Sequence, residues 1–272
     1  MEKLIITAAI CGAEVSKTDY PALPVSAQEL GDESFRAYQA GASVVHLHVR
    51  KDDGSPTQDA NVFARAMEAI RSRCDIIIQT STGGAVGMSA EERSSPLTLN
   101  PEMATLTCGT VNFGEGVFWN PPDLIESFAC MMMERGIKPE IEVFEAGMIT
   151  NALRLVKKGI LHLPLHFDFV MGVPGGITAA VRDLVYLVES LPHGCSWTVA
   201  GIGRAELQLA AVAIVMGGNV RCGFEDNIFY RKGERATHNS QLVDRIAKLS
   251  RELGREVAQP DEARIILGIT KK

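Results

Sequence analysis

A chain of 272 residues, 46% of them apolar, is long enough to bury a large core, and an α/β barrel of roughly 250 residues is a common single domain of that length. The formal net charge of -6 offers no basic surface for a nucleic acid or an anionic membrane, so neither is expected as a partner. The six cysteines form no CxxC pair, and no apolar run reaches the roughly 18 residues of a membrane-spanning helix, so we expect a cytoplasmic protein with reduced thiols.

Eight short apolar stretches rich in Val, Ile and Thr predict β-strands, and each is followed by a stretch with helical periodicity. The strands are expected to begin near Leu4, Ser43, Asp75, Met103, Glu140, Leu165, Ser196 and Asn219. The helices are expected at about 26–40, 58–73, 89–95, 121–135, 147–159, 178–191, 204–217 and 238–254, with a short last helix over 260–267. This alternation predicts an α/β fold, a (β/α)8 TIM barrel with a short extra C-terminal helix. No linker divides residues 1–272, so we expect a single domain.

Local signals mark the ends of several helices. Ser26 followed by Glu29 has the pattern of a capping box, and Gly41 lies just past the helix that these residues would begin. Gly-rich or polar turns follow six of the predicted strands, at 11–14, 81–84, 108–110, 172–176, 201–204 and 223–226. In a TIM barrel the loops after the strands form the active-site face, so these turns should meet at one mouth.

The sharpest chemical signal is the pair His46 and His48 in the second predicted strand. Residues two apart in a strand point to the same face, so both imidazoles should project together. Two imidazoles at the end of one barrel strand form half of a metal site. The alternative is a pair of hydrogen-bonded histidines in the barrel core.

The third ligand would have to come from another strand end. A catalytic zinc site takes three protein ligands, and two histidines with one carboxylate is a known set. Spacing leaves several carboxylates open as candidates: Glu14, Glu142, Glu145, Asp168, Glu225 and Asp226. Glu225 and Asp226 follow the last strand, which closes against the first and lies two strands from the histidines. Spacing does not choose between these two.

Arg221 lies on that last strand, four residues before Glu225. Gly223 between them favours a strand followed by a turn rather than a helix. An arginine close to Asp226 would orient this carboxyl group and lower its pKa. An ordinary ion pair at the rim of the barrel is the alternative.

The turn at 81–84 offers hydroxyl groups, including that of Ser81, and exposed backbone N–H groups that suit a carboxylate or phosphate oxygen. Turns with two glycines are common, so this signal is weak alone. Neither a GxGxxG fingerprint nor a P-loop occurs. Of the other histidines, His162, His193 and His238 are expected at the surface and His166 in the core.

Eight segments, spread over nearly the whole chain, are specific when taken together: LIITAAICGAE, AGASVVHLHVRKDDGSPTQD, IIIQTSTGGAVG, PEMATLTCGTVNFG, PEIEVFEAGM, GVPGG, WTVAGIGR and RCGFEDNIFY. Together they resemble the β-keto acid cleavage enzyme family. The resemblance implies a (β/α)8 barrel with one divalent metal, normally zinc, bound by His46, His48 and Glu225. Members join a β-keto acid to acetyl-CoA, releasing acetoacetate and a new acyl-CoA, and are usually homotetramers.

The resemblance also implies roles for further residues. Arg221 and Asp226 match the pair that manages the initial deprotonation. Substrate contacts are expected from Glu14, Ser81, Gly84, Thr105 and Glu142, with Glu14 at the position that meets an ammonium group. The chain most resembles members that act on 3-keto-5-aminohexanoate in lysine fermentation and form 3-aminobutyryl-CoA. One departure is Thr107, where an asparagine is expected.

The chemical needs of the implied reaction agree with the roles assigned to the metal ligands and Asp226. Retro-Claisen cleavage of a β-keto acid needs a polarised carbonyl group and a stabilised enolate, and a zinc ion supplies both as a Lewis acid. Asp226 would be the base. A buried Glu14 beside Glu142 would favour a cationic amine, so an amino-substituted substrate is expected.

Two other functions stay open at this point. A divalent-metal aldolase or lyase barrel would use no acetyl-CoA. A non-catalytic barrel that binds a metal or small molecule would keep His46 and His48 but have no use for Asp226. The ligand set also accommodates manganese, cobalt or iron. Arg50, Arg204 and Arg231 are candidates for contacts to the CoA phosphates, and the alternative is that they are solvated charges at the rim.

Overall fold

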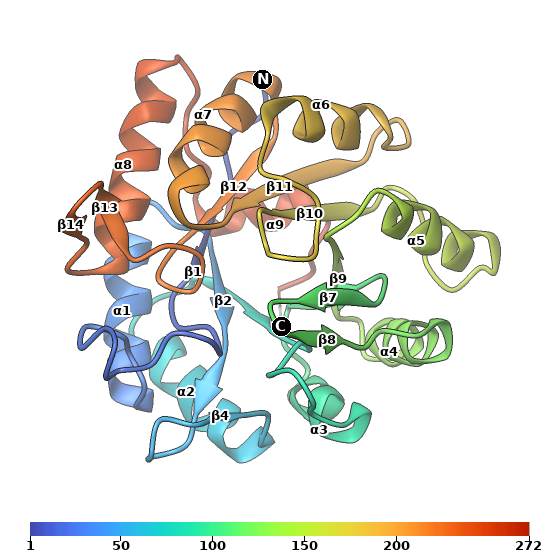
Figure 1. The fold of residues 1–272 in the computed structure, drawn as a ribbon, viewed down its shortest axis with the longest axis horizontal. Coiled ribbons are helices and arrows are strands. Elements are labelled where there is room, and N and C mark those ends of the chain that lie inside the picture. Colours follow the sequence, from blue (N-terminus) through green and yellow to red (C-terminus); the bar gives the residue numbers. More distant parts are fainter. Residues whose placement is uncertain (272) are drawn as a thin grey trace.

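The computed structural model describes residues 1–271, in which eight strands close into a barrel, so the predicted TIM-barrel fold is confirmed (Figure 1). Around the ring the strands are β1 (Ile6–Ala9), β12 (Asn219–Cys222), β11 (Ser196–Gly201), β10 (His166–Met171), β9 (Lys138–Val143), β6 (Met103–Thr107), β5 (Ile77–Thr80) and β2 (Val44–Leu47). All neighbouring pairs are parallel. Each strand begins at, or within two residues of, its expected position.

Helices connect the strands and surround the barrel, as Figure 1 shows. They are α1 (Ala27–Ala40), α2 (Ala60–Arg71), α3 (Ala90–Ser94), α4 (Pro122–Glu134), α5 (Gly147–Lys157), α6 (Val181–Glu189), α7 (Glu206–Met216), α8 (Asn239–Glu252) and α9 (Pro260–Leu267). The capping box of α1 is present, because the Glu29 N–H donates to the Ser26 hydroxyl and the Ser26 N–H donates to the Glu29 carboxylate. No helix within 1–271 is long and apolar enough to cross a membrane.

Three small hairpins were not expected from the sequence. They pair β3 (Val49–Arg50) with β4 (Pro56–Thr57), β7 (Val111–Phe113) with β8 (Gly116–Phe118), and β13 (Phe229–Arg231) with β14 (Glu234–Arg235). Strands of two or three residues are too short to show a periodic pattern. Each hairpin follows a barrel strand, so all three lie on the side of the mouth.

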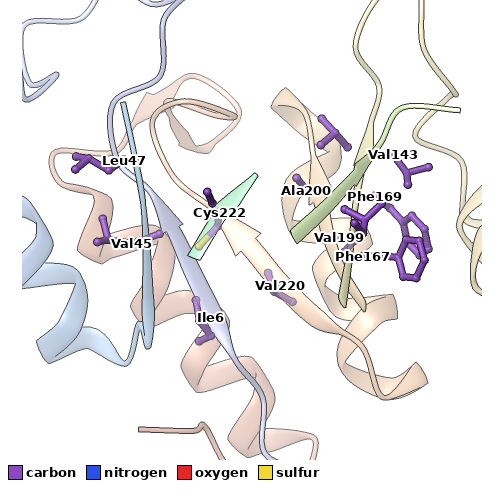
Figure 2. Packing of buried hydrophobic residues seen from close by; sticks show 14 of the residues in the cluster. Ile6, Val45, Leu47, Val143, Phe167, Phe169, Val199, Ala200, Val220 and Cys222 are labelled. Atoms are coloured by element: carbon purple, nitrogen blue, oxygen red, sulfur yellow. The ribbon is translucent and has the colours of Figure 1, made fainter. Parts of the chain in front are cut away.

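Alternation along the strands separates the packing shell from the barrel interior. In β2, Val45 and Leu47 belong to the main apolar core, and Figure 2 shows them on the same side of the strand. His46 lies between them and therefore points the other way, into the barrel. In β10 the rings of Phe167 and Phe169 stack in the shell with centroids 6.5 Å apart. The polar side chains of the strands are thereby directed to the interior.

The lower end of the barrel is closed by α9. A separate apolar cluster joins residues at, or just before, the starts of β1, β2, β5 and β6 to this helix and the segment before it: Ile5, Val44, Ile77, Met103, Ala258, Ala263 and Leu267. Arg264 of α9 donates to Glu102 at 2.6 Å and to Asp75 at 3.1 Å, which anchors the helix across the strand starts. The cavity described below therefore opens at the carboxyl ends of the strands.

Candidate metal centre and active site

His46 lies in β2 and His48 directly follows this strand, and both are buried. Their ring centroids are 5.1 Å apart. Nε2 of His46 lies 3.5 Å from Oε1 of Glu225, and Nε2 of His48 lies 3.6 Å from the same oxygen. One possible ligand atom from each of the three residues lies within 4.8 Å of the others. The structure thus brings together the three side chains that the family resemblance assigned to a metal.

Glu225 reaches the histidines because two glycines let the ends of β1 and β12 come close. Gly223 has a φ of +146°, and a Cβ there would lie 2.3 Å from the carbonyl oxygen of Ala9. A Cβ on Gly12 would lie 2.6 Å from Cγ of Glu225. The Glu225 N–H donates to the Ala9 carbonyl at 3.1 Å, which fixes the turn after β12. A side chain at either glycine would displace Glu225.

The three residues fit a divalent cation. Oε2 of Glu225 is buried and has no hydrogen-bond partner among residues 1–271, and two imidazoles with a carboxylate form a zinc ligand set with an open position. Burial lowers the pKa of His48 to about 4, so its neutral ring has a lone pair to offer. Burial would raise the pKa of Glu225, but Arg221 and the two histidines outweigh it and hold this pKa well below its usual range.

Of the carboxylates that the sequence left open, Glu225 is the one that joins the histidine pair within the described chain. Glu14 and Glu145 are exposed, whereas Asp168 is completely buried. Asp226 turns toward Arg221 instead of the histidines. Spacing left Glu225 and Asp226 open and the family resemblance implied Glu225, which is the residue that the turn brings to the histidines.

Arg221 stands at the centre of a cluster of carboxylates. Its Nε and one terminal nitrogen donate to the two oxygens of Asp226 at 2.9 and 2.8 Å, and the same terminal nitrogen donates to Glu225 at 2.6 Å. The other terminal nitrogen lies 3.6 Å from Glu142 and 3.5 Å from Asp168. A two-pronged contact of this kind fixes the plane of the Asp226 carboxyl group.

The pKa of Asp226 moves in the direction opposite to our expectation. Burial raises it, Arg221 lowers it, and the nearby charge of Glu225 raises it again, so the result is a pKa above the usual range. The sequence indicated that Arg221 lies near Asp226 but not that Asp226 is buried, and for this reason the expected lowering of its pKa is wrong. A carboxylate with a raised pKa is the stronger base.

A cavity of about 620 Å³ opens above these residues. Its polar floor is formed by His48, Glu142, Arg221, Glu225 and Asp226. One apolar wall is formed by Phe113, Phe118 and Phe144, whose rings meet edge to face with centroids 6.1 to 6.3 Å apart. The arrangement can hold an anionic or chelating group on the floor while an apolar or extended part of a ligand lies along the wall.

The turn after β5 borders the cavity with Ser81 and Gly84, as expected of substrate-contacting residues. Thr105 differs, because its hydroxyl oxygen accepts the Thr82 N–H at 3.1 Å and its side chain is fully buried. Thr105 does not border the cavity and instead holds the turn from below. A Cβ on Gly84, whose φ is +63°, would lie 2.6 Å from Sδ of Met88.

Glu142 borders the cavity and is held by Thr107, whose hydroxyl donates to it at 2.6 Å. Thr107 is the residue that stands where an asparagine was expected, so the departure bears directly on how Glu142 is oriented. Burial raises the pKa of Glu142, and Arg221 only partly opposes this.

Glu14 borders the cavity but is exposed, so the expectation of a buried Glu14 beside Glu142 is wrong. The loop after β1 carries Glu14 outward to the rim, whereas Glu142 lies at the end of a barrel strand on the floor. Water reaches Glu14, which weakens its attraction for a cation.

The arginines considered for CoA phosphates have different environments. Arg50 is buried and donates to the carbonyls of Gly12 and Gly54 at 2.7 and 3.1 Å, so it braces two loops and is no rim charge. Arg204 is exposed, and Arg231 is exposed and paired with Glu234. The other histidines lie as expected, with His166 buried and His162, His193 and His238 exposed.

Arg93, which no sequence pattern singled out, hydrogen-bonds to two segments near the mouth of the barrel. It is buried and donates to the carbonyls of Thr82 and Trp119, both at 2.7 Å, and to Oδ1 of Asn120 at 2.6 Å. Its guanidinium carbon lies 4.7 Å from the ring centroid of Phe118. In the sequence Arg93 reads as an ordinary surface charge of a short helix, and no local signal indicates its burial.

Comparison with known proteins agrees with the geometry. The chain is 57% identical over 273 residues, covering 100% of both chains, to a 3-keto-5-aminohexanoate cleavage enzyme of Fusobacterium nucleatum. It is 41% identical, over 97% of this chain and 94% of the relative, to a 3-oxoadipate:acetyl-CoA acetyltransferase of Cupriavidus necator. The solved complex of ObcA with oxaloacetate has the same fold, with a TM-score of 0.79, 20% identity, and coverage of 92% of this chain and 68% of that one. The model of the beta-keto acid cleavage enzyme family matches residues 3–269, and the chain therefore belongs to this family.

Proposed function

We propose that this protein joins 3-keto-5-aminohexanoate to acetyl-CoA and releases acetoacetate and 3-aminobutyryl-CoA, a reaction of lysine fermentation. The observation that carries the proposal is the cluster of His46, His48 and Glu225 beside the Arg221–Asp226 pair on one cavity floor. The full-length relative at 57% identity supports the amino-substituted substrate, and the name of the relative at 41% identity supports acetyl-CoA as co-substrate.

The metal we propose is zinc, held by His46, His48 and Glu225, because two imidazoles and one carboxylate suit it. When bound there, a divalent ion supplies Lewis-acid polarisation of a keto group and offsets enolate charge. Manganese, cobalt and iron accept the same ligands, so a metal analysis of the purified protein decides the identity.

Asp226 would remove a proton from C2 of the β-keto acid, with its orientation fixed by Arg221. The resulting carbanion attacks the thioester carbon of acetyl-CoA, so a carbon–carbon bond forms and CoA leaves as a thiolate. The thiolate then attacks C3, and the C2–C3 bond breaks. Its electron pair stays on C2, which takes back the proton and becomes the methylene of acetoacetate, while C3 becomes the acyl-CoA carbonyl.

The remaining residues of the cavity would bind and orient. The Ser81 hydroxyl and the backbone at Gly84 border the cavity beside its floor and would receive the substrate carboxylate. Glu142, fixed by Thr107, would face the reacting carbons, and Glu14 at the rim would face the ammonium group. Thr105 would act from below by holding the turn in place. Fixed groups of this kind lower the entropic part of the barrier.

A coupled assay tests the proposal against its alternatives. The purified enzyme is incubated with β-keto acids that have amino, neutral or acidic tails, each with and without acetyl-CoA, before and after removal of metal by a chelator. We expect acyl-CoA and acetoacetate only with acetyl-CoA and metal, and fastest with the amino tail. Cleavage without acetyl-CoA would indicate an aldolase or lyase, and binding without turnover would indicate a non-catalytic barrel.

We further propose that the protein is a homotetramer of single-domain subunits in the cytoplasm, as expected of the family. Exposed apolar side chains on the outside of the barrel, including Ile265 and Tyr186, offer surface for contact between subunits. Light scattering coupled to size-exclusion chromatography measures the assembly, and a single cooperative unfolding transition would support one domain.

A further inference from the structure

The interior of the barrel beside His46 holds a line of polar side chains that the proposed chemistry does not use. Gln79 in β5, Glu140 in β9 and His166 in β10 are each at most 2% exposed. The interior of a TIM barrel is mostly filled by branched apolar residues, so three consecutive polar groups are unusual. The large majority of buried polar groups in folded proteins are hydrogen-bonded, so the partners of these three show what holds them.

Hydrogen bonds and one close charge contact join these residues into a continuous chain that ends on a proposed metal ligand. Nδ1 of His46 lies 2.6 Å from Oε1 of Gln79, and Nε2 of Gln79 donates to Oε2 of Glu140 at 2.7 Å. The other oxygen of Glu140 lies 3.2 Å from Nε2 of His166. Nδ1 of His166 lies 2.7 Å from the hydroxyl of Ser196, which closes the chain.

Which group donates and which accepts in each of these hydrogen bonds follows from the protonation state of Glu140. Burial would raise the pKa of Glu140, but the hydrogen bond and charge of His166 outweigh it and lower this pKa, so the carboxylate is ionised and only accepts. The amino group of Gln79 must therefore face Glu140, and its carbonyl oxygen must face His46. An acceptor at this place requires a proton on Nδ1 of His46. In the neutral ring that can bind a metal, the lone pair is then at Nε2, the atom that faces Glu225.

We infer that Gln79, with its amide oriented by Glu140, is a positioning residue that holds His46 in the tautomer with its lone pair at Nε2 and thereby sets the affinity for the metal. The inference rests on the proposed metal centre. Outer hydrogen-bond partners of ligand histidines act in this way because they fix both the ring orientation and the tautomer. Here the amide of Gln79 lies between His46 and the carboxylate of Glu140, so Glu140 orients the ring of His46 through Gln79.

The test measures zinc affinity of the metal-stripped full-length protein by competition with a chromophoric chelator. Gln79→Leu keeps the approximate size of the side chain but removes the acceptor, and should weaken zinc binding about 10- to 100-fold. Glu140→Gln keeps the shape but lets the amide of Gln79 face either way, and should cause a smaller loss. Since both act through one chain, the double variant should lose about as much as Gln79→Leu alone.

Controls separate this inference from a structural role and from the metal centre itself. Thr80→Val changes the next residue of β5, whose buried hydroxyl has no partner in the described chain, and should leave zinc affinity unchanged. His46→Ala should abolish tight zinc binding. If it does not, the metal centre is wrong. If His46→Ala loses zinc but Gln79→Leu and Glu140→Gln both bind it like the unmodified protein, only the role of Gln79 is wrong.

A second measurement covers the case in which Gln79→Leu folds poorly. Nitrogen NMR of the zinc-loaded protein with labelled histidine reports which ring nitrogen of His46 carries the proton. We expect Nδ1–H in the unmodified protein, and an altered or mixed state in the isosteric Glu140→Gln variant. Coordination of zinc through Nδ1 in the unmodified protein would overturn the inference.

Discussion

Arg221 and Arg93 are both buried at the mouth of the barrel, and their charges are balanced in different ways. Arg221 contacts four carboxylates, those of Glu142, Asp168, Glu225 and Asp226. Arg93 contacts no carboxylate in the part of the chain that is described, and donates to two backbone carbonyls and one amide oxygen. One region therefore concentrates ionisable groups around a cation, and the other surrounds a cation with neutral acceptors and aromatic rings.

The surroundings shift the two pKa values in opposite directions. Burial would lower the pKa of Arg221, but Asp226, Glu225 and Asp168 outweigh it and raise this pKa well above its usual range. Burial lowers the pKa of Arg93 to about 10, so it also stays charged near neutral pH. Carboxylates around Arg221 can exchange protons with a ligand, whereas the neutral acceptors around Arg93 can only hold loops in place. We therefore expect the residues around Arg221 to take part in the reaction, and the residues around Arg93 to hold the cavity wall in place.

The largest effect is expected from Asp226→Asn. The isosteric amide can accept one hydrogen bond from Arg221 through its oxygen but cannot accept the substrate proton, so kcat should fall by about 10²- to 10⁴-fold while zinc content is unchanged. Steady-state kinetics and metal analysis measure both. Asp168→Asn is the matched control, because Asp168 also contacts Arg221 but is fully buried and outside the cavity. If the two variants lose activity equally, Asp226 is not the base.

Arg221→Lys should give the next largest effect. Lysine keeps the charge but cannot make the two-pronged contact with Asp226, so kcat should fall by about 10- to 100-fold. The same exchange at Arg93 should leave kcat within a few-fold, because no carboxylate there depends on its geometry. A larger loss of kcat in Arg93→Lys than in Arg221→Lys would reverse the comparison.

Arg93→Met should act on stability and binding. The change leaves the carbonyls of Thr82 and Trp119 without their donor, which should lower the free energy of unfolding on the order of 3 kcal/mol. Because Thr82 belongs to the turn that borders the cavity, KM should rise more than kcat falls. Urea unfolding and steady-state kinetics measure these effects. An unchanged unfolding midpoint would show that Arg93 does not brace the turn.

Sequence patterns predicted the features that depend on residues close together in the chain. Alternation along a strand placed His46 and His48 on one face, and the order of strands and helices predicted the barrel. The third ligand could not be chosen by spacing, because it depends on how closely Gly12 and Gly223 let two strand ends approach. Contacts between strands that are far apart in the sequence, such as that of Gln79 in β5 with His46 in the adjacent β2, join residues whose pairing no local pattern contains.

Burial was the quantity that the sequence did not supply. It reversed the expected direction of the Asp226 pKa, and it placed Thr105 beneath the turn rather than on the cavity. It also separated two acidic residues that look alike in the sequence, since Glu142 is buried on the floor and Glu14 is exposed at the rim.

Glu14→Gln should give the smallest effect, and it extends the comparison from buried charges to an exposed one. Because water screens a charge at the rim, the variant should lose only about two- to fivefold in kcat/KM for the amino-substituted substrate. A β-keto acid with a neutral tail should react at the same rate with both proteins, which makes it the internal control. The loss should shrink further as salt is added, since salt screens exposed charges.

If Glu14→Gln turns over the aminated substrate as well as the unmodified enzyme does, Glu14 does not meet the ammonium group. Recognition of the amine would then fall to the buried carboxylates of the floor, of which Glu142 borders the cavity and is oriented by Thr107.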